Sequence, residues 1–104
     1  MEEHHPGKII AHVDNELADL IPGYLANRKK DIVAIYDALE KNDMDTLRII
    51  GHSMKGSGGG YGFETISEIG MLMEKAAKEG LNEDVILQVE RLEDYLDQVE
   101  IVYD

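Results

Sequence analysis

The feature that most constrains this chain is a proline-free run over residues 23–104, in which apolar residues recur every three or four positions. That spacing places apolar side chains along one side of an α-helix. No stretch alternates apolar and polar residues with a period of two in a way that predicts a strand. At 104 residues, the chain has the length of one domain. We therefore expect a single all-α domain.

The apolar repeats divide into four long amphipathic helices. The first is expected over residues 24–41, and the second follows its N-cap Asp43 and runs into a glycine-rich segment. The third ends before Gly80, which suits the left-handed position after a helix. The fourth is expected to start with Asn82 as its N-cap and to carry an apolar stripe as far as Tyr103. Helices of this kind with short connections favour an antiparallel four-helix bundle.

The start of the chain is expected to differ from the bundle. Residues 1–12 are predicted to form a flexible N-terminal lead, and the helical bundle domain is predicted to span residues 13–104. A short additional N-terminal helix is expected within residues 9–21, with Asp14 as its N-cap. Pro22 is expected either to force a break or to open the next helix at its first turn.

The charge and composition exclude several classes of protein. The formal net charge is -12, and no basic patch is present that could release counterions from nucleic acid or bind an anionic membrane. We expect no nucleic acid and no membrane among the partners; the acidic balance favours partners with positive faces, although a solvated helical surface would carry the same charge. The chain has no cysteine, no signal-peptide pattern and no apolar run of membrane-spanning length. These features predict a cytoplasmic protein.

The segment "GHSMKGSGGGYG" (residues 51–62) stands out, because each glycine inside a helix costs about 0.5–1 kcal/mol relative to alanine. A helical wheel of about 100° per residue assigns sides to this helix. The side that must face the core consists of Leu47, Gly51, Met54 and Gly58. His52 falls roughly 150° from that side, so its imidazole is predicted to project towards solvent.

Other residues share the exposed sector with His52. Lys55 and Gly56 lie three and four positions further on, so both neighbour the histidine on the helix surface. Asp45, Arg48 and Gly59 belong to the same sector. Ile49 lies at its edge, where it would contact either a docking partner or the preceding helix.

The glycines of this segment have two possible uses. Gly58 would let a neighbouring helix come close, whereas Gly56 and Gly59 would let an external group approach the imidazole. Phosphoryl transfer needs an exposed nucleophile, a nearby cation and no side chain in the line of approach. Neutral imidazole is such a nucleophile near neutral pH, and Lys55 supplies the cation.

The string "HSMKGSGGGYG", which begins at His52, resembles the signature of histidine-containing phosphotransfer (HPt) domains. That signature has a His, then Leu or Met, then Lys-Gly, then small residues and a second Gly. The helical pattern resembles this family over nearly the whole chain, from about Val13 to Tyr103. The sequence differs from several family members in its run of three glycines, Gly58–Gly60, where those members have bulkier or more polar residues.

The resemblance implies a phosphocarrier of a two-component phosphorelay with a phosphohistidine intermediate. His52 would accept a phosphoryl group from an aspartate of one response-regulator receiver domain and pass it to an aspartate of another. Lys55 would steady the phosphoryl group, and Mg²⁺ would belong to the receiver, so no cofactor or metal is expected on this chain. The expected docking and clearance surface consists of Arg48, Ile49, Gly56 and Gly59. Autokinase activity is not expected, because the chain lacks a nucleotide site.

Other interpretations remain open. In a non-catalytic helical adaptor, the glycines would serve only helix packing and His52 would be replaceable. The phosphoacceptor domain of a histidine kinase usually has an acidic residue after its histidine and a later proline, whereas here Ser53 follows and no proline occurs after Pro22. Metal binding is not favoured, because the adjacent His4 and His5 would point apart on a helix.

Three further points concern the state of the chain. A monomer is expected, because one exposed histidine face needs no partner subunit. The chain is compatible both with a stand-alone protein and with the C-terminal domain of a hybrid sensor histidine kinase. Ser57 is the one residue that the sequence offers for orienting the imidazole through its second nitrogen.

Overall fold

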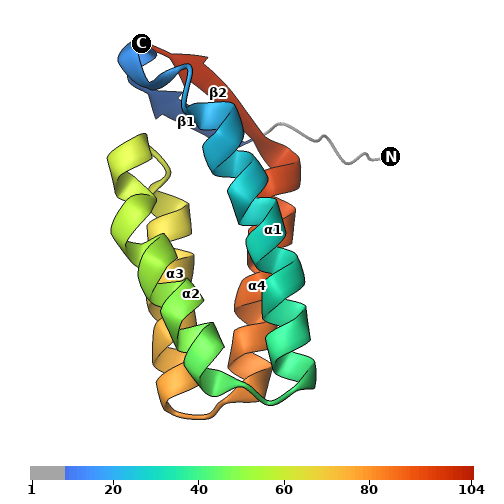
Figure 1. Cartoon of the computed structure of the whole chain (residues 1–104). Helices are drawn as coiled ribbons and strands as arrows, with labels where there is room; N and C mark the ends of the chain where they lie inside the picture. Colours follow the sequence, from blue (N-terminus) through green and yellow to red (C-terminus); the bar gives the residue numbers. More distant parts are fainter. Residues whose placement is uncertain (1–8) are drawn as a thin grey trace.

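The computed structural model of the protein describes residues 9–104 (Figure 1). Four helices make up most of this range, so the predicted helical bundle is confirmed, and a small two-stranded sheet is added to it. Two single turns of 3-10 helix, η1 and η2, complete the elements. In chain order the elements are β1 (Ile9–Val13), η1 (Asn15–Leu17), α1 (Ile21–Glu40), α2 (Met44–Ser57), η2 (Gly59–Tyr61), α3 (Glu64–Lys78), α4 (Asn82–Gln98) and β2 (Val99–Tyr103).

Helices α2 and α4 occupy opposite corners of the bundle. Helix α2 packs mainly against α3 and α1, and α4 packs mainly against the same two helices. In Figure 1 the α1–α2 and α3–α4 connections lie at one end of the bundle, and the sheet lies at the other end. The outward faces of α2 and α4 therefore belong to different sides of the molecule.

The core is built from the apolar stripes of all four helices, together with Ala11 and Val13 of β1. Fully burying one large apolar side chain stabilises a fold by about 1.5–3 kcal/mol. The largest side chains with essentially no exposed surface are Phe63, Ile21, Ile35, Leu47, Met54, Ile66, Ile69, Met73, Leu92, Val13, Val85 and Val89.

The end signals predicted from Asp43 and Gly80 are confirmed, whereas the one predicted from Asn82 is not. Asp43 is the N-cap of α2, and its carboxylate accepts hydrogen bonds from the Thr46 backbone N–H at 3.1 Å and from the Thr46 hydroxyl at 2.7 Å. Gly80 follows α3 with a φ of 70°, the left-handed conformation that glycine adopts readily. The prediction for Asn82 is wrong by one position, because Leu81 is the N-cap of α4 and makes no side-chain bond there.

The prediction that the chain contains no strand is wrong, and so is the prediction that the last helix reaches Tyr103. Helix α4 ends at Gln98, and β2 then pairs in parallel with β1, with Ile9 opposite Val99. Valine, isoleucine and tyrosine favour a pleated strand. The same residues also fit the i, i+4 spacing of a helix, so their spacing alone did not separate the two structures.

Of the short helix predicted within residues 9–21, the structure contains one turn of 3-10 helix, η1, while Ile9–Val13 form β1. Asp14 caps only the single turn η1, where its Oδ1 accepts a hydrogen bond from the Glu16 backbone N–H at 2.8 Å. Pro22 lies inside the first turn of α1, a position where proline is tolerated because no intrahelical bond is lost. Within the predicted flexible lead, residues 9–12 belong to β1, and residues 1–8 lie outside the described range.

Candidate functional site

Helices α2 and α3 approach each other closely, because two glycines face one another at their contact. A Cβ atom placed on Gly51 would lie 2.7 Å from the Glu74 backbone nitrogen, and one on Gly70 would lie 2.6 Å from the Gly51 carbonyl oxygen. Both distances are far inside van der Waals contact, so a side chain at either position would displace backbone. The glycines therefore set the α2–α3 separation and bring one edge of α3 beside the outer face of α2.

A second close contact holds the C-terminal end of α2. A Cβ atom on Gly58 would lie 2.6 Å from the Ser67 backbone nitrogen, which confirms that this glycine permits close helix approach. The Ser67 hydroxyl accepts a hydrogen bond from the Gly59 N–H at 2.7 Å and donates to the Lys55 carbonyl at 3.0 Å. These bonds satisfy backbone groups at the end of the helix. The chain then turns into α3 at Gly62, where φ is 94°.

His52 projects from α2 with 67% of its side chain exposed, as the helical wheel predicts. Its Nδ1 lies 3.0 Å from Oε2 of Glu74, which is only 7% exposed at the α2–α3 contact. Among the described residues, the second ring nitrogen, Nε2, has no hydrogen-bond partner. The carboxylate on α3 thus orients the ring while one nitrogen stays open.

The charge of Glu74 decides which ring nitrogen carries the proton. The pKa of Glu74 is lowered to about 2, chiefly because the Lys55 ammonium donates a hydrogen bond to it; the His52 contact and the Lys78 charge act in the same direction, and burial opposes them. At neutral pH Glu74 is therefore an ionised carboxylate, which only accepts hydrogen bonds. Nδ1 of His52 must donate in this contact, so Nε2 of the neutral ring holds a free lone pair.

Two lysines converge on the same carboxylate. The Lys55 Nζ lies 3.1 Å from Oε1 of Glu74, and the Lys78 Nζ lies 3.6 Å from Oε2. Their side chains are 43% and 60% exposed, so both ammonium groups reach the surface. A group with negatively charged oxygens bound at His52 would therefore meet positive charge from α2 and from α3.

The glycines on the outer face of α2 leave this site uncovered. Nothing lies within 4 Å of a Cβ atom placed on Gly56, and one on Gly59 would meet only the Ser67 hydroxyl at 3.6 Å. Packing within the described chain therefore does not require glycine at these two positions, in contrast to Gly51.

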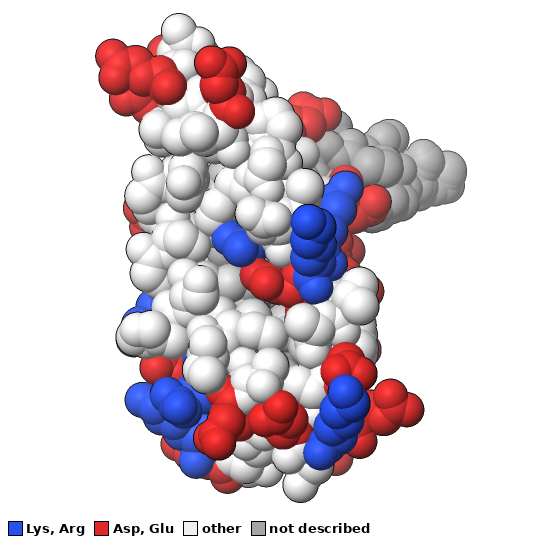
Figure 2. All heavy atoms as spheres, in the orientation of Figure 1, with Lys and Arg blue, Asp and Glu red and all other residues white. Residues whose placement is uncertain are grey.

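The surface around the site combines an apolar side chain with charges of both signs. Ile49, three positions before His52, is 59% exposed, and Arg48 and Lys78 line an open groove of about 480 Å³ together with Asp45 and Glu79. Figure 2 shows largely uncharged atoms over the C-terminal half of α2 and η2. Charged side chains gather at the end of the bundle that carries the α1–α2 and α3–α4 connections. The structure thus brings the predicted residues of α2 onto one face.

Glu74 is the site residue that sequence reasoning missed. Ser57, the residue offered for orienting the imidazole, instead has its hydroxyl 2.9 Å from the hydroxyl of Tyr24, which stacks on Tyr61. The signal for Glu74 was a single acidic residue within the apolar stripe of α3, four positions after Gly70. Buried carboxylates are rare unless they are paired, so such a residue points to a partner on the facing helix.

The rest of the described chain offers neither a metal site nor a membrane span. Within residues 9–104, no group of three or more His, Asp and Glu side chains is arranged to hold a metal ion. His12 lies 3.4 Å from Asp104, whereas His4 and His5 are outside the range. No helix of the described chain combines the length and the apolar composition that crossing a bilayer requires.

The fold and site together define a small helical bundle that presents one exposed, oriented histidine beside a lysine. A family model described as Hpt domain matches residues 9–101, nearly the whole chain. The chain therefore belongs to the Hpt domain family, whose members act in phosphoryl transfer in two-component phosphorelays, with receiver domains and kinases as partners. No curated protein and no solved structure matches the chain.

Proposed function

We propose that this protein is a phosphocarrier and that Nε2 of His52 carries the phosphoryl group. The observation that supports this proposal most strongly is the 3.0 Å contact between Nδ1 of His52 and the ionised carboxylate of Glu74. It orients an exposed ring and leaves the lone pair on the nitrogen that faces away from the carboxylate.

The proposed donor is the aspartyl phosphate of one receiver domain, and the acceptor is an aspartate of another. In the first transfer, Nε2 of His52 attacks phosphorus, the bond from phosphorus to the aspartyl oxygen breaks, and the receiver's carboxylate leaves. The ring becomes cationic, and Glu74 stabilises that charge through the Nδ1–H bond. In the second transfer, the acceptor carboxylate attacks phosphorus, the P–N bond breaks, and neutral imidazole is restored.

The residues around His52 take supporting roles in this proposal. Lys55 offsets the charge of the phosphoryl oxygens, because its ammonium already lies at the Glu74 carboxylate beside the ring. Gly56 and Gly59 clear space for the receiver's active-site loops. Ile49 and Arg48 contact the docked receiver.

The remaining parts of the proposal concern the whole chain. Mg²⁺ is supplied by the receiver, and this chain is not an autokinase. The protein acts as a cytoplasmic monomer, because one histidine face serves donor and acceptor in turn. We also propose that consecutive helices of the bundle run antiparallel, because short connections favour that arrangement.

The test is phosphoryl transfer to the full chain from isolated, phosphorylated receiver domains. We expect label on the wild type that is lost in mild acid and survives alkali, and none on His52→Gln. His12→Gln is the matched control, since His12 is also well exposed, at 64% of its side chain. NMR of the labelled imidazole should place the phosphorus on Nε2.

A failure of His52-dependent labelling would favour the alternative function, a non-catalytic helical adaptor. If His52→Gln takes up label as well as the wild type, His52 is not the phosphoacceptor. If a panel of receivers leaves the folded wild type unlabelled while labelling a known carrier, the phosphocarrier assignment is wrong, and the glycines then serve packing alone.

A further inference from the structure

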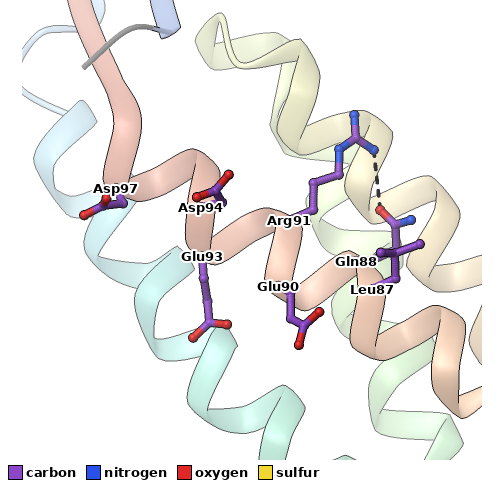
Figure 3. Close-up of a pocket in the computed structure, with 7 residues that line it drawn as sticks. All are labelled: Leu87, Gln88, Glu90, Arg91, Glu93, Asp94 and Asp97. Carbon is purple, nitrogen blue, oxygen red and sulfur yellow. Dashed lines mark hydrogen bonds between the residues drawn. The ribbon is translucent and has the colours of Figure 1, made fainter. Parts of the chain in front are cut away.

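The outer face of α4 is a second surface, remote from His52. An open groove of about 740 Å³ follows it, lined by Leu87, Gln88, Arg91 and four acidic residues between positions 90 and 97 (Figure 3). Because α4 and α2 occupy opposite corners of the bundle, a molecule bound along this groove would leave the phosphoacceptor face open.

The groove is strongly negative. Helix α4 carries six acidic residues and a single basic residue, Arg91. That guanidinium is already engaged, because its Nη2 donates to Oε1 of Glu68 on α3 at 2.6 Å. Within residues 9–104, no ion pair involves the acidic side chains that line the groove, such as Asp94 and Asp97.

One residue that lines the groove, Leu87, is apolar although its side chain is well exposed to solvent. Leu87 is 59% exposed, and the adjacent Ile86 is 38% exposed. An exposed leucine within an acidic face offers an anchor for an apolar side chain, and neighbouring carboxylates supply polar contacts around it.

A buried amide gives a third, independent indication of a ligand. Gln88 is only 8% exposed, yet the contact of its amide oxygen with Nη1 of Arg91 is long, at 3.5 Å. Its amide nitrogen has no hydrogen-bond partner among the described residues. Buried polar groups are nearly always hydrogen-bonded, so the unpartnered amide of Gln88, a residue that lines the groove, indicates a missing partner at this face.

We propose that this face of α4 is a docking site for a basic amphipathic helix of a partner protein. Lysine or arginine side chains of that helix lie against Asp94, Asp97 and their acidic neighbours, and one apolar side chain packs on Leu87. The partner stays bound while His52 meets its receivers on the other side of the bundle. The surface thus tethers the carrier and does not compete with transfer.

The test uses the full chain and a labelled helical peptide of Lys, Leu and Ala, about 20 residues long, because isolated helices of up to about 15 residues are only marginally stable in water. The peptide carries Leu and Lys on one face, and a scrambled peptide of the same composition is the control. Binding is measured by fluorescence anisotropy at low and physiological salt, and the bound face is mapped by NMR of the ¹⁵N-labelled protein. We expect amide shifts in residues 87–97 and unchanged shifts in residues 49–56.

Variants separate this site from general charge attraction. Asp94→Asn combined with Asp97→Asn should weaken binding by about fivefold to tenfold, and Leu87→Ser by a similar factor. The charge-matched control, Glu16→Gln combined with Asp19→Asn, should change affinity by less than about twofold.

The proposal is overturned if the peptide does not bind, if the scrambled peptide binds equally well, if shifts appear around His52, or if the control weakens binding as much as the α4 variants. It is also overturned if Leu87→Ser binds normally. None of these readouts depends on phosphoryl transfer.

Discussion

The outward faces of α2 and α4 come from two amphipathic helices of one small bundle, yet they are opposite in character. Helix α2 carries two basic residues and one acidic residue, and glycine clears the space beside His52. Helix α4 carries six acidic residues, one basic residue and no glycine. The net charge of -12 is therefore unevenly distributed. The carboxylate beside His52, that of Glu74, is paired with Lys55 and Lys78, so its charge is offset where a phosphoryl group would bind.

The two faces also differ in how far they depend on residues from other helices. The chemistry of the α2 face depends on α3, because Glu74 reaches His52 only where Gly51 and Gly70 bring the helices together. The α4 face is mostly a property of one helix, with Glu68 as its main contribution from α3. Variants on the two faces should therefore fail in different ways.

The largest expected effect separates the inner glycines from the outer ones. Gly70→Ala should destabilise the fold by at least about 2 kcal/mol, because the added Cβ would press on the backbone of α2. Gly56→Ala should instead stabilise it by about 0.5–1 kcal/mol, since the Cβ enters open space. Urea unfolding of both variants provides the measurement. Equal effects on the two midpoints would contradict the division into packing and clearance glycines.

The second prediction tests the contact that unites α2 and α3. Glu74→Ala should slow phosphoryl transfer to His52 by about tenfold, because the ring loses its orienting partner and the charge that stabilises the cation. Glu74→Gln should recover part of the rate, since an amide oxygen still accepts from Nδ1–H. The matched control on α4 is Glu93→Gln, for which single-turnover labelling should match the wild type. A wild-type rate for Glu74→Ala would exclude a positioning role.

The third prediction compares two apolar side chains of equal exposure. Ile49 and Leu87 are each 59% exposed, one beside His52 and one on α4. Ile49→Ser should slow transfer from a receiver by about fivefold through weaker docking, whereas Leu87→Ser should leave the transfer rate unchanged. Transfer rates at several receiver concentrations would check this. If the two variants behave alike, the docking surface has been placed on the wrong side of the bundle.

The fourth prediction concerns pH. Because the folded-state pKa of Glu74 is about 2 and its ordinary value is 4.5, this carboxylate stabilises the fold above pH 4.5, and the contribution disappears as pH falls through about 2. The difference in unfolding midpoint between wild type and Glu74→Gln should therefore shrink steadily over that range. A difference that stays constant from pH 7 to pH 2 would show that the carboxylate is not stabilised by its lysines.

The smallest expected effect lies at the α1–α4 contact. The Tyr36 hydroxyl donates to Oε1 of Glu93 at 2.8 Å, and this bond raises the pKa of Tyr36 from 10.0 to about 12. The neutral phenol therefore stabilises the fold below pH 10, and that contribution is lost as pH rises through about 12. In Glu93→Gln the absorbance titration of Tyr36 should move back towards pH 10. If the Tyr36 titration is the same in Glu93→Gln and in the wild type, the Tyr36–Glu93 hydrogen bond does not form in solution.

Much of the helical architecture could be predicted, because it depends on local spacing. Apolar repeats located the four helices, the Asp43 carboxylate marked the start of α2, and Gly80 marked the turn after α3. The wheel also predicted that His52 faces solvent and Gly58 faces a neighbouring helix. Each of these inferences uses residues within about one or two turns of one another.

The errors fall where pairing is not local. Strands β1 and β2 join segments from opposite ends of the described chain, and each is too short to be distinguished from a helical stripe by its own pattern. Glu74 was missed for the same reason. It follows His52 by 22 positions and reaches it only through the packing of α2 on α3.

By itself, the sequence determined that the chain forms amphipathic helices and that an exposed histidine shares a helix face with Lys55 and two unobstructing glycines. Helix periodicity and side-chain direction follow from backbone geometry, so these properties can be predicted from the order of the residues alone. The tertiary structure alone decided which carboxylate holds the imidazole, which of its nitrogens stays free, and how the two ends of the bundle domain pair. Those outcomes depend on how closely α2 and α3 pack and on which distant segments meet, because hydrogen bonds and ion pairs act only over a few ångströms.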